Sequence, residues 1–80
     1  MDAFSVLLAG RDGDDAYRIT VCVAHHTAEG AEELACDYAS QEGWNILRVE
    51  ETTHDAIDAT AEEPMVIDTK SRIYLDTDLH

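Results

Sequence analysis

The sequence predicts an α+β domain in which one helix packs on an antiparallel sheet of four or five strands. Three observations predict this class. Residues 17–24 alternate between apolar and polar side chains, residues 28–42 repeat apolar side chains at helical spacing, and residues 44–53 return to an extended pattern. With a further strand before this series and two short apolar segments after it, we expect a ββαβ core followed by a C-terminal hairpin.

The first two strands should form a hairpin. Residues 3–9 are an apolar run that places Phe4, Val6 and Leu8 on one face, and residues 10–15 contain two glycines among Asp and Arg, which is typical of a turn. Residues 17–24 are rich in β-branched side chains and keep a period of two. The inward face of this second strand should carry Tyr17, Ile19, Val21 and Val23.

A helix over residues 28–42 follows. Thr27 can cap its N-terminus, Glu29 in the first turn suits the helix dipole, and Gly43 supplies a stop. Spacings of three and four define its buried stripe, which consists of Ala28, Ala31, Leu34, Ala35, Tyr38 and Ala39.

The remainder of the chain is less regular. Residues 54–63 fit either a short helix or an extended edge segment, and Pro64 ends them. Residues 65–67 and 72–75 read as two short strands around a turn at 68–71, and residues 76–80 read as a loose tail. With 80 residues, burial reaches roughly 60% of the unfolded surface, so we expect one domain over 1–80 with a thin two-layer core.

Negative charge dominates the composition. Eighteen acids stand against five bases, which gives a net charge of −13. This charge argues against direct binding to nucleic acid or to an anionic membrane, because both need a cationic surface. It favours a basic protein partner, while solubility or adaptation to a salty cytoplasm remains an alternative explanation.

The predicted helix concentrates this charge. Glu29, Glu33 and Asp37 recur every four residues on one exposed face, and Glu32 lies beside them. Along the helix the acids stand about 4 Å apart, close to the phosphate spacing of a single nucleic-acid strand and sparser than a duplex. A fuller imitation of nucleic acid needs flanking acids, and the candidates for that role are Glu50, Glu51, Glu62, Glu63 and the Asp12–Asp15 turn.

No pattern indicates catalysis. The sequence lacks metal-ligand spacing, a nucleophile motif and a glycine-rich phosphate loop, so we expect no enzyme, no metal and no cofactor. The two cysteines, Cys22 and Cys36, have no CxxC spacing and should be small buried side chains. Without a cationic targeting region at its N-terminus, the protein should stay in the cytoplasm.

Small size, acid excess, absence of an enzyme motif and the hairpin–helix–strand core AYRITVCVAHHTAEGAEELACDYASQEGWNILRVEET occur together. In these features the chain resembles the small acidic phage anti-CRISPR proteins that act against type I CRISPR-Cas surveillance complexes (Cascade). The resemblance implies a non-enzymatic inhibitor that docks on a basic surface of a Cas subunit and blocks target DNA binding. An antitoxin or immunity protein that neutralises a basic nuclease is the alternative, and both a monomer and a homodimer fit the sequence.

Overall fold

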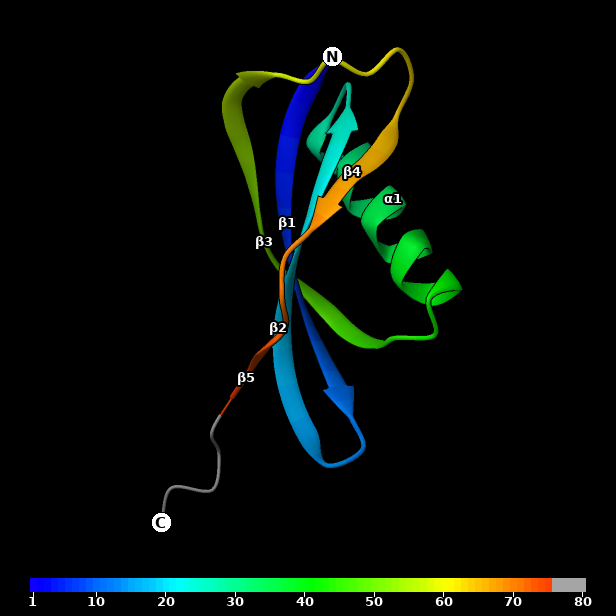
Figure 1. Cartoon of the computed structure of the whole chain (residues 1–80), viewed down its shortest axis with the longest axis vertical. Helices are drawn as coiled ribbons and strands as arrows, with labels where there is room; N and C mark the ends of the chain where they lie inside the picture. Colours follow the sequence, from blue (N-terminus) through cyan, green and yellow to red (C-terminus); the bar gives the residue numbers. More distant parts are fainter. Residues whose placement is uncertain (76–80) are drawn as a thin grey trace.

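The computed structural model describes residues 1–75, and the tail expected at 76–80 lies outside them. Its elements in chain order are β1 (Asp2–Asp12), β2 (Asp15–His25), α1 (Ala28–Gln41), β3 (Asn45–Asp58), β4 (Met65–Thr69) and β5 (Ile73–Tyr74). The sheet order is β3-β1-β2-β4, β5 also pairs with β2, and every pairing is antiparallel. The α+β class with one helix on an antiparallel sheet is therefore confirmed (Figure 1).

The β1–β2 hairpin is the long central unit of the sheet. Its register runs without interruption from the pair Asp2–His25 to the pair Asp12–Asp15, and Gly13 takes the positive φ of 64° that the turn requires. The predicted inward residues of both strands are buried: Phe4, Val6 and Leu8 on β1, and Tyr17, Ile19, Val21 and Val23 on β2.

Local capping fixes both ends of α1. The side chain of Thr27 accepts a 3.0 Å hydrogen bond from the backbone N–H of Gly30, as the N-cap prediction requires. At the other end, Gly43 has a φ of 79°, and the N–H groups of Gly43 and Trp44 donate back to Ser40 and Ala39. This is a Schellman motif, and its apolar contact is the edge-on packing of Trp44 against Tyr38.

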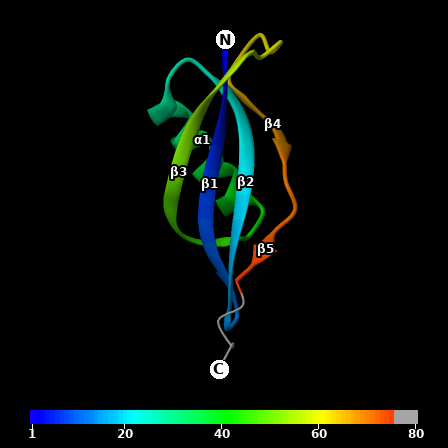
Figure 2. The same ribbon diagram turned by 90° about the vertical axis from the view of Figure 1, so that its left-hand side faces the viewer.

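The core is the predicted pair of layers, sheet and helix. Three alanines of α1, at positions 31, 35 and 39, are fully buried against the inward side chains of β1 and β2. Small side chains on this stripe allow the helix to approach the sheet closely. We call this side of the sheet the helix face, and the other side the opposite face (Figures 1 and 2).

Strand β3 settles the ambiguous segment after residue 53. The chain remains extended to Asp58 and then crosses from β3 to β4 in a loop over residues 59–64. Pairing of β3 with β1 shifts register at three places, so β3 carries β-bulges.

The predicted C-terminal hairpin is wrong. Strands β4 and β5 do not pair with each other; both pair with β2, one after the other along the same edge (Figure 2). The segment between them does not turn back, because the N–H of Lys70 donates to the carbonyl of Thr20 and the chain continues along β2. An Asp-Thr-Lys-Ser sequence that reads as a turn thus serves here as part of a long edge.

Candidate functional site

The helix presents its acids as the spacing predicts. Glu29, Glu33 and Asp37 are exposed, four residues apart, and Glu32 is half-buried on the side of the helix that faces β3. The helix contains no basic residue, so none of these charges has a cationic neighbour within α1. Like charges at this spacing repel one another by a few tenths of a kcal/mol per pair.

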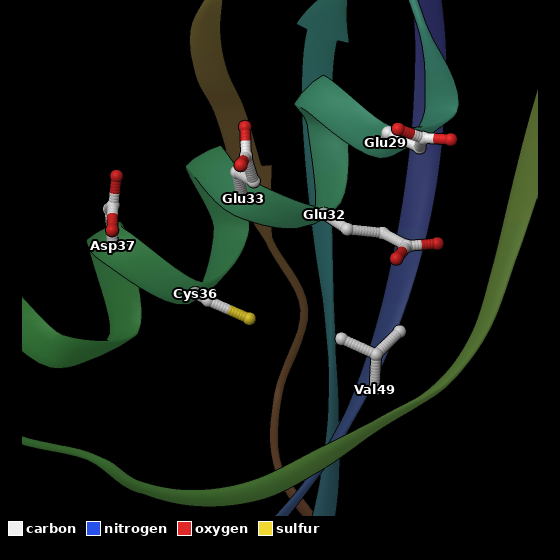
Figure 3. Close-up of a pocket in the computed structure, with 6 residues that line it drawn as sticks. All are labelled: Glu29, Glu32, Glu33, Cys36, Asp37 and Val49. Carbon is white, nitrogen blue, oxygen red and sulfur yellow. The ribbon is translucent and has the colours of Figure 1, made fainter.

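An open groove of about 600 Å³ separates α1 from β3. Figure 3 shows Glu32 and Cys36 pointing from the helix toward Val49 of β3, while Glu33 and Asp37 point away from the strand. The groove therefore has an apolar floor and a carboxylate rim. Its lining residues are Glu29, Glu32, Glu33, Cys36, Asp37 and Val49.

One hydrogen bond ties the two walls of the groove together. The hydroxyl of Thr52, on β3, donates to Oε2 of Glu32, on α1, over 2.6 Å. Thr52 lies opposite Val6 in the sheet register, which places it on the helix face. The contact holds the carboxylate of Glu32 on the β3 side of the helix.

Cys36 belongs to this groove, which the sequence analysis missed. We predicted a small buried side chain, but the thiol is half-buried and lines the groove beside Val49. Partial burial, followed by the nearby charges of Asp37 and Glu32, raises the pKa of the Cys36 thiol above its usual value. Its position four residues after Glu32 was the signal that could have placed it there. Cys22 is also half-buried rather than buried.

Glu50 and Glu51 do not flank the helix acids, contrary to the proposed role of these residues. A register shift between Leu7 and Leu8 leaves Glu50 as an extra residue in β3, and Glu51 lies opposite Leu7 on the opposite face of the sheet. Neighbouring side chains of a regular strand point to opposite faces, so at most one of the two could flank the helix, and the bulge at Glu50 removes that one as well.

Glu50 is also the acid that arginines neutralise. Its carboxylate accepts hydrogen bonds from Nε of Arg18 at 3.1 Å and from Nε of Arg48 at 3.0 Å. These contacts, with that of Arg48 the largest cause, lower the pKa of Glu50 below its usual value of 4.5.

The other proposed flanking acids lie away from the groove. Glu62 and Glu63 are exposed in the loop over residues 59–64, at the end of the sheet that carries the N-terminus (Figure 1). The Asp12–Asp15 turn lies at the other end of a molecule 46 Å long. There Asp12 accepts from Nη1 of Arg72 and from the Tyr74 hydroxyl.

The chemistry available to the groove is attraction of cations. Among residues 1–75, no three His, Cys, Asp or Glu side chains come together in a way that could hold a metal ion. The helix in this part of the chain is too short to cross a membrane.

No protein-family model matches the chain, and no curated protein or solved structure is detectably similar to it.

Proposed function

We propose that the protein is a non-enzymatic inhibitor that docks the acidic groove between α1 and β3 on a basic, nucleic-acid-binding surface of another protein. The observation that carries the proposal is the uncompensated charge of the groove. Four acids, Glu29, Glu32, Glu33 and Asp37, line one open groove, whereas Arg18 and Arg48 are held by Glu50 on the opposite face. Charge of this kind speeds encounter with a basic surface and sets its orientation.

The groove suits a lysine or arginine side chain of the partner. Such side chains combine an aliphatic stem with a cationic head, and they bury the stem against apolar surface while the head meets a polar group. In the groove, Val49 and Cys36 would contact the stem, and the carboxylate of Glu32 would meet the head. Glu33 and Asp37, which point outward, would contact bases further along the partner surface.

Three of the four groove acids, Glu29, Glu33 and Asp37, form one narrow row along α1, and Glu32 lies beside this row on the side that faces β3. A single row, without a second row beside it, corresponds in width to one nucleic-acid strand and not to a duplex, although its charges repeat every ~6 Å against ~3.4 Å for the phosphates of one strand. The partner surface that fits it is therefore a basic groove about one strand wide.

For the partner we propose a Cas subunit of a type I surveillance complex, in the cytoplasm of a bacterial host. The acid row would occupy the Lys/Arg surface that otherwise holds target DNA, and binding of the DNA would be blocked by overlap and by charge. The resemblance to small acidic anti-CRISPR proteins supports this partner. A basic nuclease neutralised by the same groove is the alternative.

A pull-down from a lysate of a CRISPR-bearing bacterium tests the proposal. The tagged protein is bound at low salt, eluted at high salt, and the eluate is identified by mass spectrometry. We expect Cas subunits in the salt eluate and their loss when Glu33→Lys and Asp37→Lys are combined. The matched control, Glu62→Lys with Glu63→Lys, makes the same charge change outside the groove and should retain the partner.

Two other outcomes of the pull-down would change the proposal. A lone basic nuclease in the eluate would replace the Cas subunit with the immunity-protein role. An eluate that the two double variants do not change would contradict docking through the groove. Circular dichroism of each variant checks that its fold is intact.

A further inference from the structure

The edge formed by β4 and β5 gathers exposed apolar side chains. Four of the six large exposed hydrophobic residues of the described chain lie here: Met65 (47% exposed), Ile67 (50%), Ile73 (67%) and Tyr74 (49%). Within residues 1–75, no strand pairs with the outer side of this edge (Figure 2). Free backbone groups beside apolar side chains are what a further strand would need.

The same edge lacks the acidity of the rest of the molecule. Residues 64–75 contain one acid, Asp68, and two bases, Lys70 and Arg72, in a chain whose net charge is −13. A second copy of this chain carries the same −13, so it would meet little repulsion at this edge and strong repulsion at the acid-rich helix. The charge distribution therefore favours a second copy as the occupant of the edge.

A hollow beside the edge could receive an apolar side chain. It has a volume of about 290 Å³ and is lined by Thr60, Ala61, Met65 and Ile67. Ile73 lies further along the same edge and is the most exposed of the four apolar residues there. The edge thus carries both a hollow and a side chain of a size to enter it, which is the condition for a symmetric, self-complementary contact.

We propose that two copies of the chain pair antiparallel along this edge, around a two-fold axis at Thr69. This register sets Met65 opposite Ile73 of the second copy, and Asp68 opposite Lys70 of the second copy, each contact occurring twice. Residues paired directly across two antiparallel strands must lie on the same face of the sheet, and Met65 and Ile73 do. Met65 lies beside Ala24 and Ile73 lies beside Arg18, both on the opposite face. Ile73 of one copy enters the hollow beside Met65 of the other.

The competing edge, β3, is less suited to a second copy. It carries four acids, Glu50, Glu51, Asp55 and Asp58, so two copies paired there would bring like charges together. It does expose two large apolar side chains, Leu47 (54%) and Ile57 (68%). Ile57 therefore provides a control that matches Ile73 in residue type and exposure.

Sedimentation equilibrium of the full chain tests the dimer. Because the two copies repel at long range, we expect association to strengthen as NaCl rises from about 0.1 M to about 1 M, where charges are screened over about 3 Å. The expected species has twice the monomer mass of 8.9 kDa. Ile73→Asp should weaken the dimer at least tenfold, and Ile57→Asp should leave its dissociation constant unchanged.

A charge exchange tests the register. Lys70→Asp alone and Asp68→Lys alone each place like charges opposite one another and should weaken the dimer, and the two together should restore it. A monomer at every salt concentration would overturn the proposal, as would a dimer that Ile57→Asp disrupts and Ile73→Asp does not. Failure of restoration, in variants whose circular dichroism is unchanged, would overturn the Thr69 register.

Discussion

Thr52 on β3 donates a 2.6 Å hydrogen bond from its hydroxyl to the carboxylate of Glu32 on α1. The contact joins the strand and the helix that form the walls of the acidic groove, and both groups are partly buried. It gives Glu32 a donor on the inner side of the groove, so that Glu32 faces β3 while the neighbouring acids face solvent.

Replacing Thr52 with Val should destabilise the protein. The substitution keeps the shape of the side chain but leaves the half-buried carboxylate of Glu32 without its donor, so we expect the free energy of unfolding to fall by about 1 kcal/mol. Urea denaturation measures the change. The control is Thr53→Val, whose hydroxyl bonds the exposed Glu51 at 3.2 Å, and it should change stability much less. Equal losses in the two variants would contradict a special role for the Thr52–Glu32 contact.

Gly30, in the first turn of α1, lies directly against the imidazole ring of His25. A Cβ at position 30 would overlap the His25 ring, which is held in place because its Nδ1 accepts hydrogen bonds from the N–H groups of His26 and Thr27. We therefore expect Gly30→Ala to destabilise the protein, although alanine is the better helix former.

In a His25→Ala background the effect of Gly30→Ala should reverse. With the ring removed, the helix preference of alanine remains, and we expect a gain of up to about 1 kcal/mol. The double-mutant cycle, measured by thermal or urea unfolding, isolates the coupling of the two residues. Additive effects of the two substitutions would contradict the contact.

Cys36 should react slowly with alkylating reagents at mildly alkaline pH. Burial and the charges of Asp37 and Glu32 raise the pKa of its thiol, so a smaller fraction is thiolate, the reactive form, at a given pH. The measurement is the rate of iodoacetamide modification in a Cys22→Ser background. We expect Asp37→Asn to raise the rate, because it removes a negative charge beside the thiol and lowers its pKa.

The matched control for Asp37→Asn is Glu63→Gln. Glu63→Gln removes an equal charge from the loop after β3, away from the groove, and should leave the alkylation rate unchanged. An equal acceleration by Glu63→Gln would mean that net charge, and not the local position of Asp37, governs the thiol.

Glu50 should stabilise the protein only above acidic pH. Its pKa in the folded protein is lowered below 4.5 by Arg48 and Arg18, so its contribution is fully present above that value and is lost as the pH falls through the lower, folded pKa. We expect Glu50→Gln to lower the urea midpoint at pH 7. The difference from the wild type should shrink as the pH falls below 4.5. Glu51→Gln, which removes the same charge without losing an arginine contact, should have the smaller effect at pH 7.

Periodic segments of the sequence predicted most of the fold. Tyr17, Ile19, Val21 and Val23 alternate strictly, and Thr27 and Gly43 bracket one apolar stripe, so local chemistry alone determines the β2 strand and the α1 helix. The placement of β4 and β5 along the same edge of β2 was not predictable in the same way. Residues 68–71 look like a turn, but Asp68 and Thr69 pair with β2, and the N–H of Lys70 donates to Thr20, fifty residues earlier in the chain.

The candidate site was predictable where it lies on one element. The helical acids follow from a spacing of four residues, which holds for any regular helix. The flanking acids depended on β3, and there a bulge at Glu50 changes the face on which the following residues point. A bulge arises from the pairing of two distant strands, so no pattern within β3 alone reveals it.

The measurement that tests the central claim most directly is target-DNA binding by a purified type I surveillance complex, taken from the bacterium whose Cas subunits the protein captures. The wild-type protein and the Glu62→Lys, Glu63→Lys variant should reduce DNA binding. The Glu33→Lys, Asp37→Lys variant should leave DNA binding as it is without the inhibitor. If that variant inhibits as strongly as the wild type while remaining folded, the acidic groove is not the inhibitory surface.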